Sequence, residues 1–378
     1  MNTNNRTTTI SGRLMSIDAL RGFDMFWIIG GGAIFSSLAK MWNNPVTEMI
    51  QRQLSHVEWE GFHFEDLIFP LFLFIVGAVL PFSISRRAER GQKRGRLYLH
   101  IVKRMVVLIL LGFIMNGLLR FDWPNMRFAG VLQMIGLSYF FAAIIMLNTS
   151  VRMQTIITAG LLLGYWAALA LIGAQMTRNG IVVCFGAGDY TIQGNLVSFL
   201  DQMFLPGTRY YGPTDGAGPF LTIAGTANVL LGVLAGHWLR SSLSQKRKVV
   251  GLVAAGLACL VIGSLWGQVF PIIKKIWISS FVLFTGGWSL LLLALFYWVI
   301  DVKGYKKWAI FFVVIGMNPI TIYFLQSFVN FKGVADFFVQ GFAEHAGLME
   351  PLILTFGVLM VKWLFLWFLY RHRIFFKL

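Results

Sequence analysis

Long apolar runs alternate with short polar stretches along the 378 residues of the chain. A helix needs about 20 mostly apolar residues to cross the roughly 30 Å hydrocarbon layer of a bilayer. Runs of this length predict about ten membrane-spanning helices, with boundaries accurate to a few residues. They lie at 17–39, 64–85, 97–119, 128–147, 151–174, 219–239, 248–270, 277–300, 307–329 and 351–370.

The apolar runs do not have the pattern of a membrane β-barrel. Barrel strands are short and alternate between apolar and polar residues, whereas the run at 67–80 (LIFPLFLFIVGAVL) is apolar throughout. Hydrophobic residues make up 57% of the chain and charged residues 13%, which leaves too few polar side chains to cover a soluble core. The predicted fold class is therefore all-α, a polytopic membrane protein.

The net charge of +16 raises the question of nucleic-acid binding. With the N-terminus placed in the cytoplasm, the cytoplasmic segments carry about twice as many Lys and Arg residues as the outer segments, as the positive-inside rule describes. The basic residues therefore report topology, with both termini inside, and we expect no nucleic-acid partner. The predicted location is the inner membrane of a bacterium, with the lipid bilayer as the main partner.

The polar segments suggest how the chain is organised. Residues 1–12 are rich in Asn and Thr and predict a disordered cytoplasmic tail, and residues 13–378 predict one membrane domain. A long outer loop at 175–218, rich in Gly, Pro and Tyr, separates five helices from five. Segments 43–60 and 333–347 have apolar residues at helical spacing, which predicts short amphipathic helices on the outer surface.

Ionisable and amide side chains inside membrane helices are costly, so each one is a candidate site residue. Asp18 and Arg21 lie one helical turn apart near the cytoplasm and form either a structural ion pair or part of a ligand pocket. Buried amides form either hydrogen bonds between helices or substrate contacts. The amides concerned include Gln133, Asn228 and Asn318.

The segment around His56 is the richest in candidate chemistry. In SHVEWEGFHFEDLIFP a histidine, three glutamates, a tryptophan and an aspartate directly precede an apolar helix. An imidazole beside a carboxylate can act as a general base, and Asp66 is the natural partner of His56. The alternative is a solvated surface histidine and an aspartate that favours the positive end of the helix dipole.

Basic residues at the cytoplasmic side could bind the phosphates of a nucleotide or of coenzyme A. The stretch 86–96 (RRAERGQKRGR) is followed by His100 and Arg104 in the next helix. Contact with anionic lipid headgroups is the alternative. The chain has no P-loop or Rossmann motif, and its two cysteines lack CxxC spacing, so we expect no metal site.

Several motifs together resemble the heparan-α-glucosaminide N-acetyltransferase family and its bacterial relatives. These are RLMSIDALRG at 13–22, H-x-x-W-x-G at 56–61 followed by DLIFP at 66–70, RFAGVLQ at 127–133, TANVLLGVLAG at 226–236, K-x-x-W-x-x-S at 274–280, DVKG at 301–304 and GMNP at 316–319. The resemblance covers nearly the whole chain, and the histidine motif with DLIFP is its most specific part.

The resemblance implies a multipass enzyme that takes acetyl from cytosolic acetyl-CoA and delivers it to the amino group of a glucosamine-type sugar, or glycan end, on the other side. It implies that His56 is catalytic, as acetyl acceptor or general base, with Asp66 as its neighbouring carboxylate, and it suggests a homodimer. Residues expected at the substrate are Trp59, Glu60, Arg127, Gln133, Asn228, Lys274, Trp277 and Asn318. Residues expected at acetyl-CoA are Asp18, Arg21, Arg86, Arg87, His100 and Arg104.

Two alternatives stay open at this point. Lys274 and its neighbour Lys275 also fit an interfacial role beside Trp277. Some bacterial proteins of this type are regarded as transporters of N-acetylglucosamine or related sugars, so an amino-sugar transporter without chemistry is the rival function. The cluster around His56 at one mouth of the bundle favours chemistry.

Overall fold

The structure is a computed structural model, and it describes residues 14–42, 44–178 and 181–376. The predicted tail at 1–12 lies outside the described residues. Nine helices in the described part of the chain are long and apolar enough to cross a membrane. The prediction of an all-α, polytopic membrane protein is therefore confirmed, with the small additions described below.

Two of the predicted spans are interrupted. The first consists of α1 (Met15–Phe26), a π-helical turn (Trp27–Gly31) and α2 (Gly32–Met41), with Gly30 at φ 122°. The ninth, predicted at 307–329, consists of α12 (Ala309–Met317) and α13 (Pro319–Leu325), because a residue before proline is disfavoured in the α conformation. Asn318 at this break donates to the carbonyl of Ile374 and accepts from the N–H of Phe376.

The remaining elements follow along the chain, and β1, β2 and α8 among them were not predicted. They are α3 (Pro45–Gln53), α4 (Ile68–Glu89), α5 (Arg94–Met115), α6 (Val131–Asn148), α7 (Val151–Leu171), β1 (Ala174–Arg178), β2 (Ile181–Phe185), α8 (Leu196–Phe204), α9 (Leu221–Arg240), α10 (Gln245–Trp266), α11 (Ser279–Phe296), α14 (Phe331–Glu344) and α15 (Glu350–Arg371). The predicted surface helices are α3 and α14. The loop 175–218 contains structure that the polar composition concealed, an antiparallel hairpin and α8.

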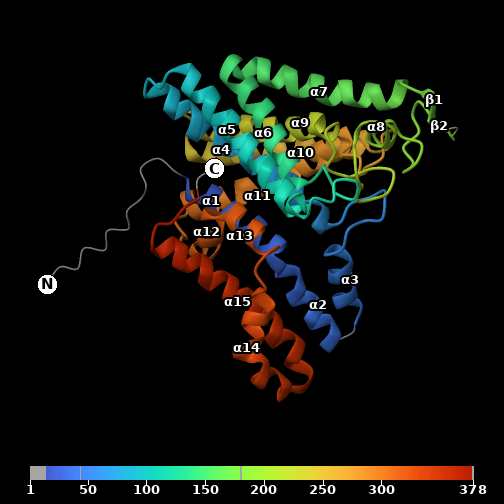
Figure 1. Ribbon diagram of the computed structural model, residues 1–378. Coiled ribbons are helices and arrows are strands. Elements are labelled where there is room, and N and C mark those ends of the chain that lie inside the picture. Colours follow the sequence, from blue (N-terminus) through green and yellow to red (C-terminus); the bar gives the residue numbers. More distant parts are fainter. Residues whose placement is uncertain (1–13, 43, 179–180, 377–378) are drawn as a thin grey trace.

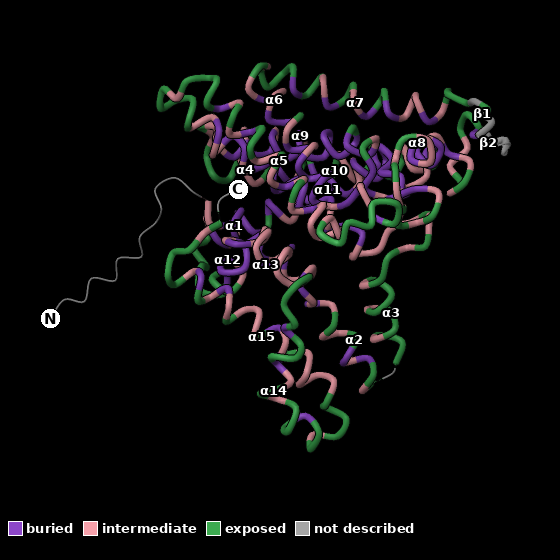
Figure 2. Tube along the Cα trace, in the orientation of Figure 1, coloured by how far each residue is buried: buried purple, intermediate pink, exposed green. Residues whose placement is uncertain are grey.

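Figure 1 shows the helices in two groups. The middle of the chain, α4 to α11, forms the upper group, and α1, α2 and α12 to α15 form the lower one. Helices α4 and α9 are the most buried spans, while fewer than a third of the residues in the spans α5, α7, α10 and α15 are buried, as in lipid-facing helices (Figure 2). The spatial grouping therefore joins the two ends of the chain rather than dividing it at the outer loop.

Glycines allow the central helices to approach closely. A Cβ placed on Gly77 of α4 would lie 1.9 Å from the carbonyl oxygen of Val229, and one on Gly232 of α9 would lie 1.9 Å from that of Phe74. In a bilayer, helix association depends on van der Waals packing, and small residues at the contact permit it. Helix α4 of this pair belongs to the second predicted span, and the first turn of that span holds Asp66.

Candidate functional site

The site is built on the loop between α3 and α4. A short 3-10 turn, Phe64–Asp66, precedes α4, and Oδ2 of Asp66 accepts backbone N–H groups of Val57 at 3.3 Å and His63 at 3.1 Å. These bonds fold the loop back on itself and bring His56 over the start of α4. The second oxygen of Asp66 is left for side chains.

His56 and Asp66 form the predicted pair. Nδ1 of His56 lies 2.9 Å from Oδ1 of Asp66. The carboxylate side chain is 2% exposed and the imidazole 50% exposed, so one partner is fixed and the other reaches solvent. This is the geometry in which a carboxylate orients an imidazole and stabilises its charged form.

Lys274 reaches the same pair from the other end of the sequence. The loop before α11 pairs with the His56 loop through an antiparallel bridge between Glu60 and Ile273, and Gly61 donates its N–H to Ile272. Nζ of Lys274 lies 3.2 Å from Oδ1 of Asp66 and 3.1 Å from Nδ1 of His56. Burial lowers the pKa of Lys274, and the carboxylate of Asp66 opposes that shift.

A cavity of about 340 Å³ opens beside these three residues. Its volume lies within the range of about 300–1,000 Å³ that is typical of small-molecule sites. Its polar lining consists of His56, Glu65, Arg127, Asp215 and Lys274, together with Tyr210, Tyr211 and Tyr323. Its apolar lining comes from side chains of α1, α4 and α6 that include Met25, Phe72 and Ile135.

Arg127 and Asp215 form a buried ion pair in the cavity wall. Nε and Nη2 of Arg127 each lie 2.7 Å from an oxygen of Asp215, and the ring of Tyr210 lies 5.1 Å from the guanidinium. Burial opposes the charge of Arg127, but the Asp215 carboxylate outweighs it and raises the pKa. Asp201 supports this pair from behind, because its Oδ2 accepts the N–H of Asp215.

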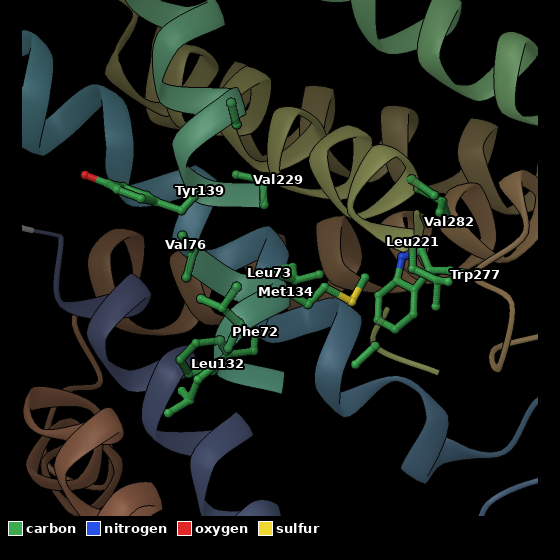
Figure 3. Close-up of a cluster of buried hydrophobic side chains, with 14 of the residues drawn as sticks. Phe72, Leu73, Val76, Leu132, Met134, Tyr139, Leu221, Val229, Trp277 and Val282 are labelled. Carbon is green, nitrogen blue, oxygen red and sulfur yellow. The ribbon is translucent and has the colours of Figure 1, made fainter. Parts of the chain in front are cut away.

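The other residues predicted at the substrate do not line this cavity. Trp59 donates its indole N–H to the carbonyl of Tyr190 and lines, with Glu60, a separate shallow groove. Trp277 is fully buried among the apolar side chains of Figure 3. Gln133 contacts Phe128, Asn228 donates to Pro70, and Asn318 binds the C-terminal segment.

Among the residues that the structure describes, the lining of the cavity includes none of the six predicted at acetyl-CoA. Asp18 and Arg21 pair at 2.9 Å, and Arg21 also donates to the carbonyl of Gly316. Arg86 lies over Phe82, Arg87 is exposed and His100 is half-buried. Arg104 differs from these, since its guanidinium lies 4.4 Å from the ring centre of Tyr139, inside the bundle.

Sequence reasoning missed several residues of the cavity. Glu65 is one of four carboxylates in the segment 55–70, so nothing in the sequence distinguished it. Tyr210, Tyr211 and Asp215 belong to a loop whose folding no periodicity reveals. The signal that could have found them is composition. Paired tyrosines, an aspartate and three glycines within nine residues (YYGPTDGAG) are unusual for a simple connector.

The chain is similar in sequence to known proteins. Residues 13–123 match a family described only as a domain of unknown function, DUF5009. The chain is 25% identical over 435 residues to heparan-α-glucosaminide N-acetyltransferase of Homo sapiens and 26% identical over 428 residues to that of Mus musculus. These alignments cover 99% and 97% of this chain and 61% of each relative, so the chain spans about three-fifths of the relatives' length. The expected resemblance is confirmed.

Proposed function

We propose that this chain is a membrane N-acetyltransferase that moves an acetyl group from cytosolic acetyl-CoA to the amino group of a glucosamine-type sugar at the outer face of a bacterial inner membrane. The observation that carries the proposal is the pairing of His56 with the buried Asp66 at the mouth of a ligand-sized cavity. The similarity to acetyltransferases over nearly the whole chain supports it.

The chemistry requires a base for the amino group. A protonated amine cannot attack a thioester, so Nε2 of His56 removes a proton from the sugar ammonium while Nδ1 stays bound to Asp66. The free amine then attacks the acetyl carbonyl, the carbon–sulfur bond breaks and the thiolate of coenzyme A leaves with a proton. The sum is one amide, one thiol and one released proton.

A covalent route uses the same geometry. His56 can attack the thioester itself through Nε2, so that the carbon–sulfur bond breaks and the thiolate of coenzyme A leaves with a proton. In a second step the free amine attacks the acetyl group on Nε2, the bond to Nε2 breaks and one proton is released. Both routes need His56 to point into the cavity and need Asp66 to hold its other nitrogen. Isotope exchange between acetyl-CoA and labelled coenzyme A without an acceptor separates the routes, because only the covalent one permits it.

The apolar lining of the cavity suggests a path for the donor. Val131 and Ile135 of α6 line the cavity, and Tyr139 follows Ile135 by one helical turn, about 6 Å along the axis. Figure 3 shows Tyr139 at the opposite end of the apolar cluster from Trp277, and the guanidinium of Arg104 lies over its ring. The thioester arm would pass along α6 while the charged nucleotide stays at the basic cytoplasmic end.

A carboxylate in the cavity wall suits a cationic acceptor. Glu65 lines the cavity together with His56, and the pair of tyrosines, Tyr210 and Tyr211, offers aromatic surface and hydroxyl groups for a sugar ring. Asp215 is neutralised by Arg127, so we assign the ammonium of the acceptor to Glu65.

The test is to give purified protein radiolabelled acetyl-CoA with glucosamine and to measure acetylated sugar. Wild type should form product, and His56→Gln should reduce the rate by about 10²–10⁴, the usual contribution of a general base. His345→Gln is a matched control, since His345 is exposed, does not line the cavity and hydrogen-bonds through Nδ1 to the carbonyl of Gly341. Equal rates in both variants would remove His56 from the mechanism.

The interrupted helices favour a second candidate, an amino-sugar transporter. Broken helices at the membrane midplane are a feature of secondary transporters, and here the breaks at Gly30 and Asn318 lie in neighbouring helices. In proteoliposomes without acetyl-CoA, a transporter accumulates labelled N-acetylglucosamine in the lumen. An acetyltransferase does not, and it consumes acetyl-CoA instead.

A further inference from the structure

Lys274 creates a conflict at the His56–Asp66 pair. Three polar atoms, Nζ of Lys274, Nδ1 of His56 and Oδ1 of Asp66, lie within 3.2 Å of one another. Oδ2 of Asp66 is already occupied by two backbone N–H groups, so only Oδ1 serves the side chains. Nδ1 can therefore form one hydrogen bond, either with Asp66 or with Lys274.

The two choices correspond to different tautomers of His56. An Nδ1 that carries the proton donates to Asp66, and Nε2 is then free to accept a proton. An Nδ1 without a proton accepts from the ammonium of Lys274, and the ring proton lies on Nε2. Only the first tautomer can act as a base towards the cavity.

We propose that Lys274 is a positioning residue that selects the tautomer of His56. In the empty site its ammonium donates to Nδ1 and keeps the ring proton on Nε2. When a cationic acceptor enters, its charge repels Lys274 towards Asp66, Nδ1 takes the proton and Nε2 becomes the base. One proton moves between the ring nitrogens through solvent, which the half-exposed ring permits, and the net charge does not change.

The charged surroundings are consistent with such a change. Glu65 lies near both His56 and Lys274 and balances the additional cation. Lys275, on the same loop, is held elsewhere, since it donates to the carbonyl of Glu58 and lies 4.5 Å from the ring centre of Tyr211. Lys274 is therefore the lysine of this loop that contacts the pair.

This inference rests on the proposed function, but its main readout needs no turnover. Protein labelled with ¹⁵N-histidine in lipid nanodiscs reports the protonation of each ring nitrogen by solid-state NMR, and His56→Gln assigns the signals. We expect wild type to carry the proton on Nε2 without ligand and on Nδ1 with glucosamine. Neutral N-acetylglucosamine, the matched probe, should leave the tautomer unchanged.

Two variants separate tautomer control from a general structural role. Lys274→Met should show Nδ1–H with and without glucosamine, and Lys274→Arg, which keeps the charge, should behave as wild type. The same tautomer in wild type and Lys274→Met, or a wild-type tautomer that ignores glucosamine, overturns the proposal. Neither result depends on whether acetylated sugar is formed.

A kinetic readout applies to the active protein. Removing a positive charge 3.1 Å from Nδ1 favours the imidazolium, so the acidic limb of the pH–rate profile should move up by about one unit in Lys274→Met. Lys40→Met removes an exposed charge from the predicted outer side and should leave the limb in place. A lower rate with an unmoved limb indicates a merely structural lysine and contradicts the inference.

Discussion

The two carboxylate oxygens of Asp66 have different partners. One is fixed by backbone N–H groups of the loop, and the other faces His56 and Lys274. Its place at the start of α4 adds the positive end of the helix dipole to these partners. The two interpretations of Asp66, as a helix-start aspartate and as the partner of His56, therefore both apply.

Asp66→Asn keeps the shape of this residue and removes its charge. We expect acetyl transfer to fall by about 10²–10⁴, because the imidazolium of His56 loses its counter-charge. The assay is the formation of acetylated glucosamine from labelled acetyl-CoA. Glu58→Gln removes a carboxylate from the same loop, where it is exposed, and should leave the rate near that of wild type.

Asp201 makes the outer loop sensitive to pH. Burial raises its pKa from the ordinary 3.8 to about 6, so the folded protein holds this proton more tightly than the unfolded chain does. The contribution of protonated Asp201 to the free energy of unfolding is fully present below about pH 4. It is lost as pH rises through about 6, and the loss is about 3 kcal/mol. Asp201→Asn mimics the protonated acid.

The melting temperature in detergent tests this prediction. Asp201→Asn should be as stable as wild type near pH 4 and more stable than wild type at pH 7.5. Thr214, whose hydroxyl donates to Asp201, and the N–H of Asp215 can both bind the amide oxygen, so the variant keeps these contacts. A stability difference that does not change with pH contradicts the assignment.

At the scale of elements, the site depends on the pairing of two loops. Gly61 has φ 121° and its N–H donates to the carbonyl of Ile272 at 2.8 Å, which holds the His56 loop against the Lys274 loop. Side chains rarely adopt this conformation, so Gly61→Ala should strain the pairing by about 1–3 kcal/mol. We expect a large loss of activity and only a small fall in the melting temperature.

Gly91→Ala is the matched control for this loop. Gly91 also has positive φ, at 78°, and lies in the α4–α5 turn, on the opposite side of the predicted membrane. A Cβ there meets nothing within 4 Å, so the two variants differ mainly in which loop they strain. Equal losses of activity in both would show that the paired loops have no special role.

The close contact between α4 and α9 should not tolerate an added methyl group. Gly77→Ala places a methyl group 1.9 Å from the carbonyl oxygen of Val229, and this backbone cannot yield without moving the helix. We expect a loss of folded protein, measured as the monodisperse fraction after purification and as melting temperature. Gly164→Ala on α7 meets nothing within 4 Å and should behave as wild type.

For the whole molecule, hydropathy predicted the spans and the all-α class because a bilayer imposes helix length directly. It did not predict the interruptions at Gly30 and Asn318, since apolar composition continues across both. Nor could it show that α1 and α12 pack together, because helix pairing depends on surface shape, here on Gly22 and Gly316.

The candidate site was predictable only where its residues are close in sequence. His56 and Asp66 are ten positions apart, and a single loop brings them together. Lys274 lies 218 positions from His56 and arrives through a β-bridge between two loops, a contact that no local pattern encodes. Arg127 and Asp215 likewise meet through the fold of the outer loop.

The most direct measurement follows acetyl groups across a membrane. Proteoliposomes with the predicted cytoplasmic side inward are loaded with radiolabelled acetyl-CoA, and glucosamine is added outside. We predict labelled N-acetylglucosamine in the external medium with wild-type protein and about 10²–10⁴-fold less with His56→Gln. External glucosamine that stays unacetylated, while labelled N-acetylglucosamine supplied outside accumulates in the vesicles without donor, would contradict the account.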